Sequence, residues 1–421
     1  MALIVQKFGG SSVADAAAMK RVAARIADTR KAGNDVVVVV SAMGDTTDDL
    51  LDLAAQVTTN PPAREMDILL TAGERISMAL LAMAITEQGV DARSYTGQQA
   101  GVLTDSKYGK ATIVGVVPDR IRKTLAKGQV AIVAGFQGVN AANDVTTLGR
   151  GGSDTTAVAL AAALEADVCE IYTDVDGVFT ADPRVVPTAR RIPQLSTEET
   201  LELAAHGAKI LHLRAVEFAR RYNVPLHVRS SFSTLEGTWV INPTEENPME
   251  EPIIAGVAHD RSQGKVTVVG IKDVPGSAAH LFTVLADADA NIDMIVQNPP
   301  TDRQGVTDIS FTAPESAIPD IAKALEDAKA DLGYSDVIYN SQIGIVSLVG
   351  AGMRTNTGVS STLFKALSDA GINVDMISTS EIRISVVTAA DKVDDAVRAI
   401  HTAFGLDSQD TEAVVYGGTG R

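Results

Sequence analysis

Residues 3–12 read Leu-Ile-Val-Gln-Lys-Phe-Gly-Gly-Ser-Ser, an apolar strand that passes directly into a pair of glycines. Further β-branched runs at residues 36–40, 131–134 and 168–172 have the composition of buried strands. Alanine-rich stretches with apolar residues at helical spacing predict helices at residues 16–29, 48–56, 76–87 and 156–164. This alternation of strands and helices predicts an α/β fold with a largely parallel sheet and helices on both of its faces.

The composition excludes several classes of protein. The chain has 421 residues, with 36 Lys and Arg against 53 Asp and Glu, and a formal net charge of −17. An acidic surface repels nucleic-acid phosphates, and aromatic residues at 4% offer few platforms for stacking bases. A single cysteine, Cys169, and six scattered histidines exclude an internal disulfide and a zinc cluster. Any bound metal is therefore expected to be a hard cation, and no residue is assigned as a metal ligand.

The sequence also shows no membrane segment. The longest wholly apolar runs, such as residues 157–164, are too short to cross a bilayer. The first residues lead at once into a strand, without the charged and apolar regions of a secretory leader. We therefore expect a cytoplasmic protein that contacts neither membrane nor nucleic acid.

Prolines and acids cluster without apolar periodicity at residues 242–252, as they do in a linker. Beyond this linker the sequence repeats itself. Residues 265–270 resemble residues 345–350 at an offset of 80, and residues 291–295 resemble residues 373–377 at an offset of 82.

Each copy of the repeat has a strand, a glycine turn, an amphipathic helix and further strands, which predicts two βαββαβ, or ferredoxin-like, modules. Gly276 in the first copy matches Gly358 in the second. A glycine turn at a helix N-terminus suits a small ion or zwitterion, although a duplicated module that only dimerises is also consistent with the pattern. We expect one domain over residues 1–248, the linker and first module over residues 249–340, and the second module over residues 341–421.

Several segments carry residues suited to chemistry. Lys7 and the pair Gly9-Gly10 follow the first strand, where backbone amides and a lysine could hold a phosphate. This is no Walker A loop, and such a turn also occurs for purely structural reasons. Residues 149–156 read Gly-Arg-Gly-Gly-Ser-Asp-Thr-Thr, which places an arginine suited to a carboxylate among glycines before a helix. Ser153 or Asp154 could also simply cap that helix.

Residues 172–184 form a long polar turn after a buried strand, at the sheet edge where ligands dock in open α/β folds. The spacing within this turn does not match a calcium loop. Segments 41–47 and 71–75 lie at a strand end and a helix start, and each alone could be a capping box. Lys209 lies in an otherwise apolar stretch and by itself is typical of a helix lysine with a buried stem.

Taken together and in this order, these segments and the doubled module resemble the aspartate kinases over the whole chain. The likeness is strongest to the actinobacterial lysine-pathway enzymes, which end in a form similar to residues 414–421. The resemblance implies an amino-acid-kinase fold followed by two ACT domains. It implies the reaction of ATP with L-aspartate to give 4-phospho-L-aspartate and ADP, with Mg²⁺, in the biosynthesis of lysine, threonine and methionine.

The resemblance also implies roles for individual residues. Lys7 and Lys209 would meet the ATP phosphates, and Asp154 would orient these catalytic lysines. The implied ATP-binding residues are Lys7, Phe8, Gly9, Gly10, Ser11, Thr173, Asp174, Asp182, Arg184 and Lys209. Arg150 would bind the α-carboxylate of L-aspartate and Glu74 its ammonium group, and the implied neighbours of this substrate are Ser41, Thr47 and Ser153.

In the repeat, the resemblance implies feedback inhibition by lysine and threonine together and a homo-oligomer formed by paired ACT modules. Met249 lies where some relatives start a separate regulatory subunit, so an α₂β₂ assembly is a further expectation. The implied effector residues of the first copy are Asp273, Gly276, Ser277, Ala278, Asn291, Ile292, Asp293 and Gln297. Those of the second copy are Ser360, Asn373, Val374, Ser380 and Glu381.

The chain departs from its relatives at two effector turns. It has Pro299-Pro300 where relatives usually carry a small aliphatic residue and a serine, and Asn356-Thr357 where they usually carry His-Pro. A proline lacks an amide donor, so an effector contact at residues 299–300 is open to change.

Other functions fit part of this pattern. A kinase of the same fold acting on N-acetylglutamate or a nucleoside monophosphate would share the glycine loops, but such kinases generally lack the doubled tail. A non-catalytic amino-acid sensor would keep the fold, and ATP turnover would distinguish it. Residues 350–352 lack the third glycine of a dinucleotide-binding loop, so a fused dehydrogenase is not expected.

Overall fold

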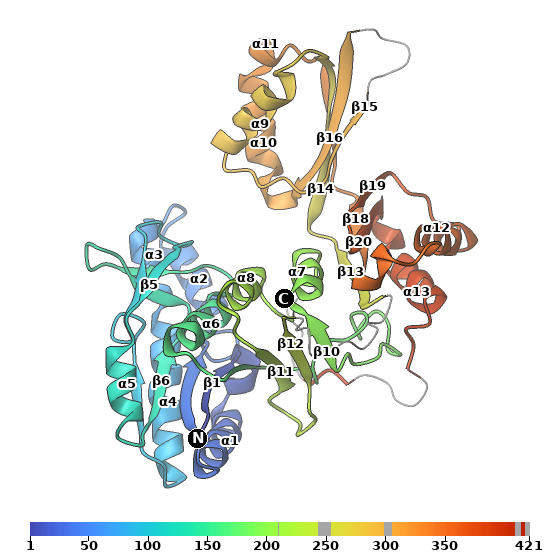
Figure 1. Cartoon of the computed structure of the whole chain (residues 1–421). Helices are drawn as coiled ribbons and strands as arrows, with labels where there is room; N and C mark the ends of the chain where they lie inside the picture. Colours follow the sequence, from blue (N-terminus) through green and yellow to red (C-terminus); the bar gives the residue numbers. More distant parts are fainter. Residues whose placement is uncertain (209, 243–253, 299–304, 409–413, 417–421) are drawn as a thin grey trace. The chain divides into compact units, whose positions relative to one another are not determined.

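The computed structural model describes residues 1–208, 210–242, 254–298, 305–408 and 414–416 (Figure 1). Two compact units make up the chain. The first unit comprises Met1–Ala205, Lys209–Glu250 and Ser408–Arg421, and the second comprises His206–Ala208 and Glu251–Asp407.

An eight-stranded sheet forms the centre of the first unit. Its strands are β1 (Leu3–Phe8), β2 (Asp35–Val40), β3 (Ala92–Tyr95), β6 (Val130–Ala134), β9 (Val168–Thr173), β10 (Gln194–Ser196), β11 (Leu226–Ser230) and β12 (Thr238–Ile241). They lie in the order β10-β12-β11-β9-β1-β2-β6-β3, and all neighbours are parallel except β11 and β12. The largely parallel sheet predicted from the sequence is confirmed.

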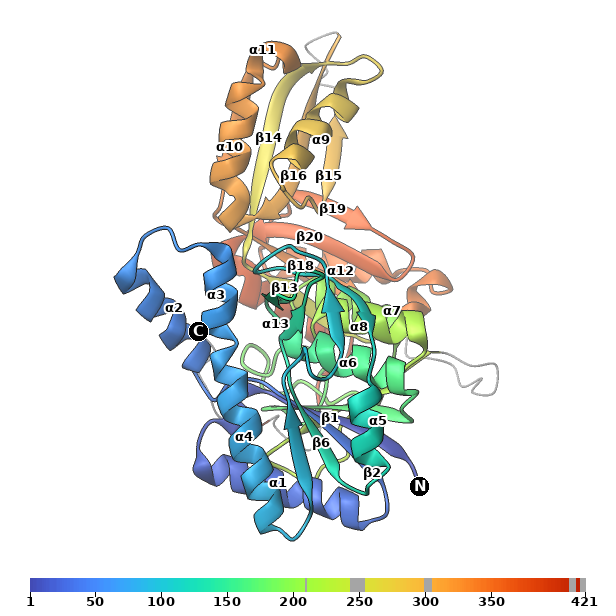
Figure 2. The same ribbon diagram turned by 90° about the vertical axis from the view of Figure 1, so that its left-hand side faces the viewer.

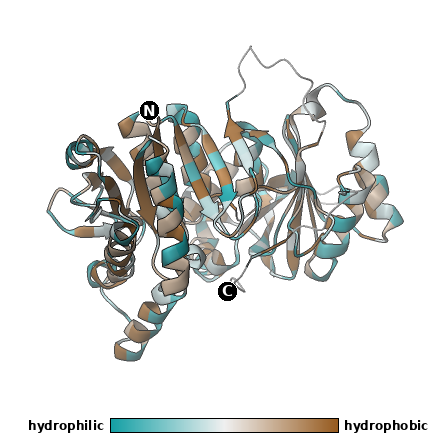
Figure 3. Ribbon diagram, turned by 90° about the horizontal axis from the view of Figure 1, so that it is seen from below, coloured by the Kyte–Doolittle hydropathy of each residue, from teal (hydrophilic) through white to brown (hydrophobic). Residues whose placement is uncertain are grey.

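Helices cover both faces of this sheet (Figure 2). The helices of the unit are α1 (Ala16–Lys31), α2 (Thr46–Val57), α3 (Ala63–Leu70), α4 (Ala72–Glu87), α5 (Asp119–Leu125), α6 (Gly152–Leu164), α7 (Thr197–Ala205) and α8 (Leu213–Tyr222). Helices α1 and α4 pack on one face through a core cluster that includes Val36, Val38 and Val40, and α5 and α6 lie on the other face. Residues 36–40 of β2 are all valine and all buried, as expected for a strand covered on both faces. Figure 3 shows brown, hydrophobic strands inside the molecule.

The structure adds elements that the sequence did not predict, among them helices α5, α7 and α8 and strands β3, β10, β11 and β12 of the large sheet. Helix α3 was not predicted, and neither was a small four-stranded sheet in the order β5-β4-β7-β8. These strands are β4 (Val102–Thr104), β5 (Ile113–Val116), β7 (Gln137–Val139) and β8 (Val145–Thr147). Strands of three or four residues are too short to show a clear alternation of apolar and polar positions.

One helical stretch of the described chain, residues 63–87, is long and apolar enough to cross a membrane by length and composition alone. The same test is passed by helices that belong to a folded core. In this stretch Leu81 and Ile85 are fully buried against the sheet, and Glu74 is also buried. These contacts place the α4 part of the stretch in the core of the first unit. That the protein does not contact a membrane stays a prediction.

The second unit contains two ferredoxin-like modules, as predicted. The first has β14 (Gln263–Lys272), α9 (Ser277–Asp287), β15 (Ile295–Asn298), β16 (Val306–Pro314), α10 (Ile318–Asp327), α11 (Lys329–Leu332) and β17 (Asp336–Asn340). The second has β18 (Ile343–Val349), α12 (Val359–Asp369), β19 (Met376–Thr379), β20 (Arg383–Ala389) and α13 (Val393–Ala403). Gly276 and Gly358 precede α9 and α12 with φ of 100° and 95°, so the matched glycines of the repeat are equivalent in structure.

The expectation that each copy supplies all four of its own strands is wrong for the second module. Its fourth strand is β13 (Gly256–Asp260), which precedes the first module in the chain and pairs antiparallel with β18. In the first module β17 fills this position beside β14. The chain returns to the first unit soon after α13, so an earlier segment covers the free edge of β18. The domain limits at residues 248 and 340 stay predictions.

Candidate active site

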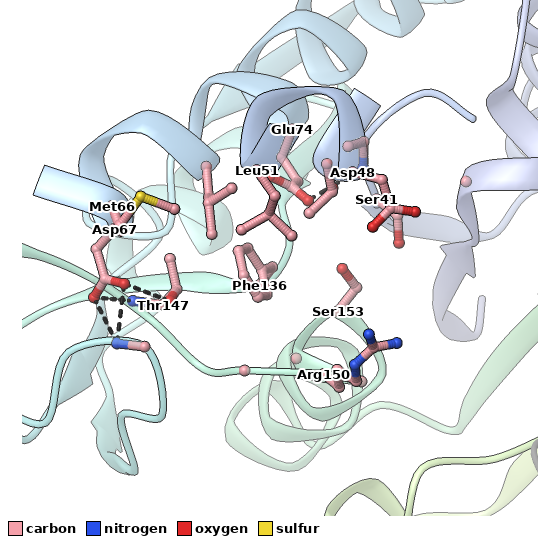
Figure 4. A pocket seen from close by; sticks show the side chains of 18 of the residues that line it. Ser41, Asp48, Leu51, Met66, Asp67, Glu74, Phe136, Thr147, Arg150 and Ser153 are labelled. Atoms are coloured by element: carbon pink, nitrogen blue, oxygen red, sulfur yellow. Dashed lines mark hydrogen bonds between the residues drawn. The ribbon is translucent and has the colours of Figure 1, made fainter. Parts of the chain in front are cut away.

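A pocket of about 730 Å³ lies in the first unit at the carboxyl ends of β1, β2 and β6 (Figure 4). Ligands of open parallel sheets bind at this edge, where backbone groups and loop side chains converge. The structure brings together here nine of the residues predicted for the site, namely Lys7, Gly9, Gly10, Ser41, Thr47, Glu74, Arg150, Ser153 and Asp154.

Lys7 and Asp154 form an ion pair in this pocket. Lys7 lies near the end of β1 and Asp154 in the first turn of α6, and their Nζ and Oδ1 atoms are 2.6 Å apart. The two side chains are only 13% and 11% exposed, so little water screens the pair. Asp154 therefore holds the Lys7 ammonium group in a fixed position at the wall of the pocket.

Two glycines allow the backbone to approach closely around this pair. A Cβ atom on Gly10 would lie 3.0 Å from the carbonyl oxygen of Ala42. Gly151, directly before α6, has a φ of 70°, and a Cβ atom on it would lie 2.0 Å from the His212 ring. Only glycine fits these positions without displacement, which explains the glycines in the two loops.

Glu74, in the first turn of α4, lines the same pocket (Figure 4). Its Oε1 atom accepts the N–H of Ala42 at 3.2 Å. Burial raises the pKa of Glu74 to about 7. Its second oxygen, Oε2, is buried and has no hydrogen-bond partner within the described part of the chain. A bound ammonium group would supply the missing donor and favour the ionised carboxylate.

Arg150 lies in the loop between β8 and α6, close to Ser153 at the pocket (Figure 4). Arg150 is exposed, so its guanidinium group is available to a carboxylate that enters from solvent. Lys7 and Arg150 are the cations among the described lining residues, and they face four carboxylates. These are Asp48, Asp67, Glu74 and Asp154.

The predicted nucleotide residues at the end of β9 and in the turn after it do not line this pocket. Thr173 donates its hydroxyl to Asp174 at 3.0 Å, and Arg184 pairs with Asp182 at 2.9 Å. The turn begins beside the pocket because β1 and β9 are adjacent, and Gly9 donates its N–H to the Tyr172 carbonyl. The two predicted halves of the site therefore share one edge of the sheet.

Some predicted residues occupy other positions than expected. The Phe8 side chain is fully buried and stacks on Tyr172, with ring centroids 4.6 Å apart, so only its backbone is available to a ligand. Ser11 is exposed and lies outside the pocket lining. Lys209 lies outside the described residues. The alternative that Ser153 or Asp154 caps the following helix is wrong, because both lie inside α6 and Gly151 occupies the cap position.

Several residues of the pocket were not predicted from the sequence. Phe136 follows β6, lines the pocket and adopts a φ of 69°, which a bulky residue rarely does. Asp67 is fully buried, and its carboxylate accepts hydrogen bonds from the backbone N–H groups of Gly109 and Thr147 and from the Thr147 hydroxyl. The run Gly-Phe-Gln-Gly at residues 135–138, directly after a recognised strand, was a usable signal for Phe136.

The predicted effector residues all lie in the second unit. In the first module they occupy the turn before α9, the first two residues of α9, the segment before β15, and β15 itself. Asp293 in this set lies 3.8 Å from His206, measured between Oδ2 and Nε2. In the second module Ser360 lies in α12, and the Asn373 carbonyl accepts the Thr388 hydroxyl at 2.8 Å. Pro299, Pro300 and Met249 lie outside the described residues.

Comparison with known proteins defines the class of this chain. Residues 2–230 match the amino acid kinase family, and residues 265–330 and 346–404 each match an ACT domain. The fold and its pocket are therefore those of an amino acid kinase that carries two ACT domains. The chain is 63% identical over 422 residues to the aspartokinase of Mycolicibacterium smegmatis and 59% identical to that of Corynebacterium glutamicum. Each alignment covers 100% of both proteins, and the chain belongs to the aspartokinase family.

Solved structures agree with this assignment. Aspartokinase III of E. coli, in complex with aspartate and ADP, is similar with a TM-score of 0.82 and 26% identity, over 95% of this chain and 99% of that one. The aspartate kinase of Synechocystis is 42% identical with a TM-score of 0.54, over 97% and 70%. The chain is thus an ATP-dependent kinase, and the predicted family and fold are confirmed.

Proposed function

We propose that this enzyme transfers the γ-phosphate of ATP to the β-carboxylate of L-aspartate, giving 4-phospho-L-aspartate and ADP. The observation that carries the proposal is the convergence of the Lys7–Asp154 pair with Glu74 and Arg150 in one pocket. The ligands of the E. coli enzyme, aspartate and ADP, are a substrate and a product of this reaction.

The acceptor explains why the pocket needs no general base. The β-carboxyl group of aspartate has an ordinary pKa near 4, so it is ionised at pH 7 and can attack without losing a proton. A carboxylate oxygen forms the new bond to the γ-phosphorus while the bond to the β,γ-bridging oxygen breaks and ADP leaves. The difficulty is the repulsion between two anions, which a fixed cation at the reacting groups relieves. Lys7, held by Asp154, is that cation, and Lys209 would add a second.

The two ends of aspartate match two residues of opposite charge. Glu74 presents a buried carboxylate oxygen suited to the α-ammonium group, and Arg150 presents a guanidinium group suited to the α-carboxylate. Ser41, Thr47 and Ser153 would add hydroxyl groups around the bound molecule. Held at both ends, the substrate would direct its β-carboxylate along one path, which lowers the entropic part of the barrier.

The residues present fit a Mg²⁺ ion that enters with the nucleotide. Within the described residues no cluster of three His, Cys, Asp or Glu side chains could hold a metal by itself. Mg²⁺ in kinases is usually bound by phosphate oxygens, water and one or two carboxylates, so a dedicated cage is not needed. Asp154, which pairs with Lys7 in the pocket, is the carboxylate that would contact such an ion, and the ion would offset the charge of the phosphates.

Hydroxamate formation from L-aspartate, ATP, Mg²⁺ and hydroxylamine tests the reaction, because hydroxylamine traps an acyl phosphate. We expect an ATP-dependent rate with L-aspartate and none with N-acetylglutamate. A chain that binds ATP but gives no aspartyl hydroxamate would contradict the proposal. Such a chain would be a kinase for another carboxylate or a sensor.

Lysine and threonine are the proposed inhibitors, acting together through the ACT modules. This rests on the two ACT domains and on the E. coli relative, which has been solved in complex with lysine and aspartate. The same assay would show a rate that falls mainly when both amino acids are present. Inhibition by neither would leave the catalytic proposal intact and point to the altered turns at residues 299–300 and 356–357.

The reaction would be the first step of lysine, threonine and methionine biosynthesis, and the enzyme would act in the cytoplasm. We further expect a homo-oligomer formed by paired ACT modules. Sedimentation of the purified protein checks the assembly, because a monomer has a mass of 44.0 kDa. A shorter product beginning near Met249 in the same preparation would indicate the α₂β₂ form. A single 44.0 kDa species would contradict the paired assembly.

A further inference from the structure

The end of the chain returns to the first unit after the second ACT module. Helix α13 belongs to the second unit, whereas the chain from Ser408 onward belongs to the first. Ser408 donates its N–H to the Thr188 carbonyl at 2.7 Å. The described residues Val414–Tyr416, which we term the C-terminal strap, then lie against the turn that follows β9.

The strap makes both backbone and ring contacts with its surroundings. Val415 forms an antiparallel bridge with Val175, and Tyr416 donates its N–H to the Asp174 carbonyl at 2.8 Å. The Tyr416 ring stacks on Phe232, with centroids 5.9 Å apart and planes inclined by 10°. The strap therefore binds the turn at consecutive residues rather than at a single point.

Two further hydrogen bonds hold the turn to the loop after β11. Ser231 donates its N–H to the Thr173 carbonyl at 3.0 Å, and the Ser233 hydroxyl donates to Asp176. Burial raises the pKa of Tyr416, and the neighbouring Asp176 carboxylate raises it further. Residues 173–176, which begin the turn, are thus held by contacts with the loop after β11 and with the strap.

We propose that the strap completes the nucleotide-binding turn and that Tyr416 is a positioning residue for ATP. This inference rests on the proposed placement of ATP at Thr173, Asp174, Asp182 and Arg184. A polar turn with a glycine at φ 128°, Gly177, needs outside contacts to hold one conformation before the ligand arrives. The Tyr416 side chain acts through its stack on the Phe232 ring, which holds the strap and its backbone contact with Asp174 in place. Loss of this side chain should therefore weaken ATP binding and leave kcat almost unchanged.

Steady-state kinetics of purified full-length variants test this role, together with the Kd of a fluorescent ADP. Tyr416→Ala should raise the KM for ATP and the Kd for ADP by about fivefold, in line with loss of an aromatic stack and its anchoring. The KM for aspartate and kcat should change by less than about twofold. Tyr416→Phe keeps the ring stack and loses only the hydroxyl beside Asp176, so its KM for ATP should lie closer to the wild-type value than that of Tyr416→Ala. Tyr222→Ala, which removes an exposed tyrosine of the same unit, is the matched control.

Arg184→Ala separates failure of this inference from failure of the proposed ATP site. If Arg184→Ala raises the KM for ATP and Tyr416→Ala does not, the strap has no positioning role. If neither variant changes ATP binding in an active enzyme, the turn is not the nucleotide site and the inference falls with it. A Tyr416→Ala protein with a lower kcat and with similar increases in the KM for ATP and the KM for aspartate would also overturn the inference. That result would indicate a general loss of structure.

Discussion

At the scale of single residues, the site depends on a few charges in a pocket that is itself acidic. Lys7 contributes an ammonium group held 2.6 Å from Asp154, where water is largely excluded. Charge fixed in this way costs no reorganisation when the phosphoryl group transfers, which is why preorganised cations have large effects on rate.

Replacement of Lys7 by Ala should lower kcat by at least about 10²-fold, because the fixed charge at the phosphates is lost. Asp154→Ala should have a similar effect, since it releases the lysine that Asp154 holds. The hydroxamate rate at saturating substrates measures both, with Lys20→Ala as a control at an exposed lysine. A folded Lys7→Ala protein with near-normal kcat would remove Lys7 from the catalytic residues.

Arg150→Ala should chiefly raise the KM for aspartate, by about tenfold or more, because a charged hydrogen-bond partner of the α-carboxylate is lost. The KM for ATP should change little, which makes the ratio of the two values informative. Arg120→Ala, at an exposed arginine of α5, serves as the control. An unchanged KM for aspartate would show that Arg150 does not bind the substrate.

Glu74 predicts a pH dependence of aspartate binding. Its pKa is raised to about 7, so in the free enzyme the carboxylate is mostly ionised above this pH and mostly protonated below it. Only the ionised form attracts the ammonium group, so the KM for aspartate should rise as the pH falls from about 8 to about 6. Glu74→Gln should give a high KM that no longer varies over this range. Parallel pH profiles for the two proteins would contradict the role of Glu74.

At the scale of elements, the pocket depends on where α6 begins. Gly151 is the cap residue, and its left-handed backbone places Ser153 and Asp154 in the first turn of the helix, on the pocket wall. The amino end of a helix carries partial positive charge, which favours anions such as phosphate at this position. The loop before α6, the first turn of α6 and the ion pair with Lys7 therefore form one continuous wall of the pocket.

Gly151→Ala should lower the free energy of unfolding by more than the strain of an alanine in a left-handed backbone conformation. Gly89 has a similar φ of 76° and open space around it, so Gly89→Ala should cost about 1 kcal/mol of unfolding free energy. At Gly151 the new methyl group also meets the His212 ring, which should add about 1–3 kcal/mol. Urea unfolding midpoints measure the difference. Equal losses for the two variants would show that His212 relaxes freely.

At the scale of the whole molecule, two units are joined by a chain that passes between them more than once. Residues 206–208 belong to the second unit although α7 and α8, on either side, belong to the first. Asp293, a predicted effector residue, lies beside His206 in this short segment. Feedback inhibition through the ACT domains needs effectors that bind one of two conformational states of the enzyme better than the other.

Asp293→Asn should weaken inhibition by lysine and threonine while the uninhibited rate stays close to that of the wild type. The expected change is an increase of about tenfold in the half-inhibitory concentration of the pair, as for loss of one charged contact. Asp287→Asn, at the exposed end of α9, is the control. Unaltered inhibition in Asp293→Asn would exclude Asp293 from the effector site.

Much of this architecture could be predicted from local patterns. The valine run of β2, the alanine-rich α6 and the two copies of the repeat are each recognisable because they depend on residues near one another in the chain. The loops with Lys7, Glu74 and Arg150 were also found, because glycines and charges at strand ends are local signals. The family follows from the order of these segments.

Only the tertiary structure decided which distant segments meet. The pairing of β13 with β18, the position of Phe136 on the pocket wall and the contact of Tyr416 with the turn after β9 join residues far apart in the chain. Many short apolar segments could pair with a given strand edge, and packing of the whole unit selects one. Local sequence therefore sets what each segment can form, while long-range packing sets its partner.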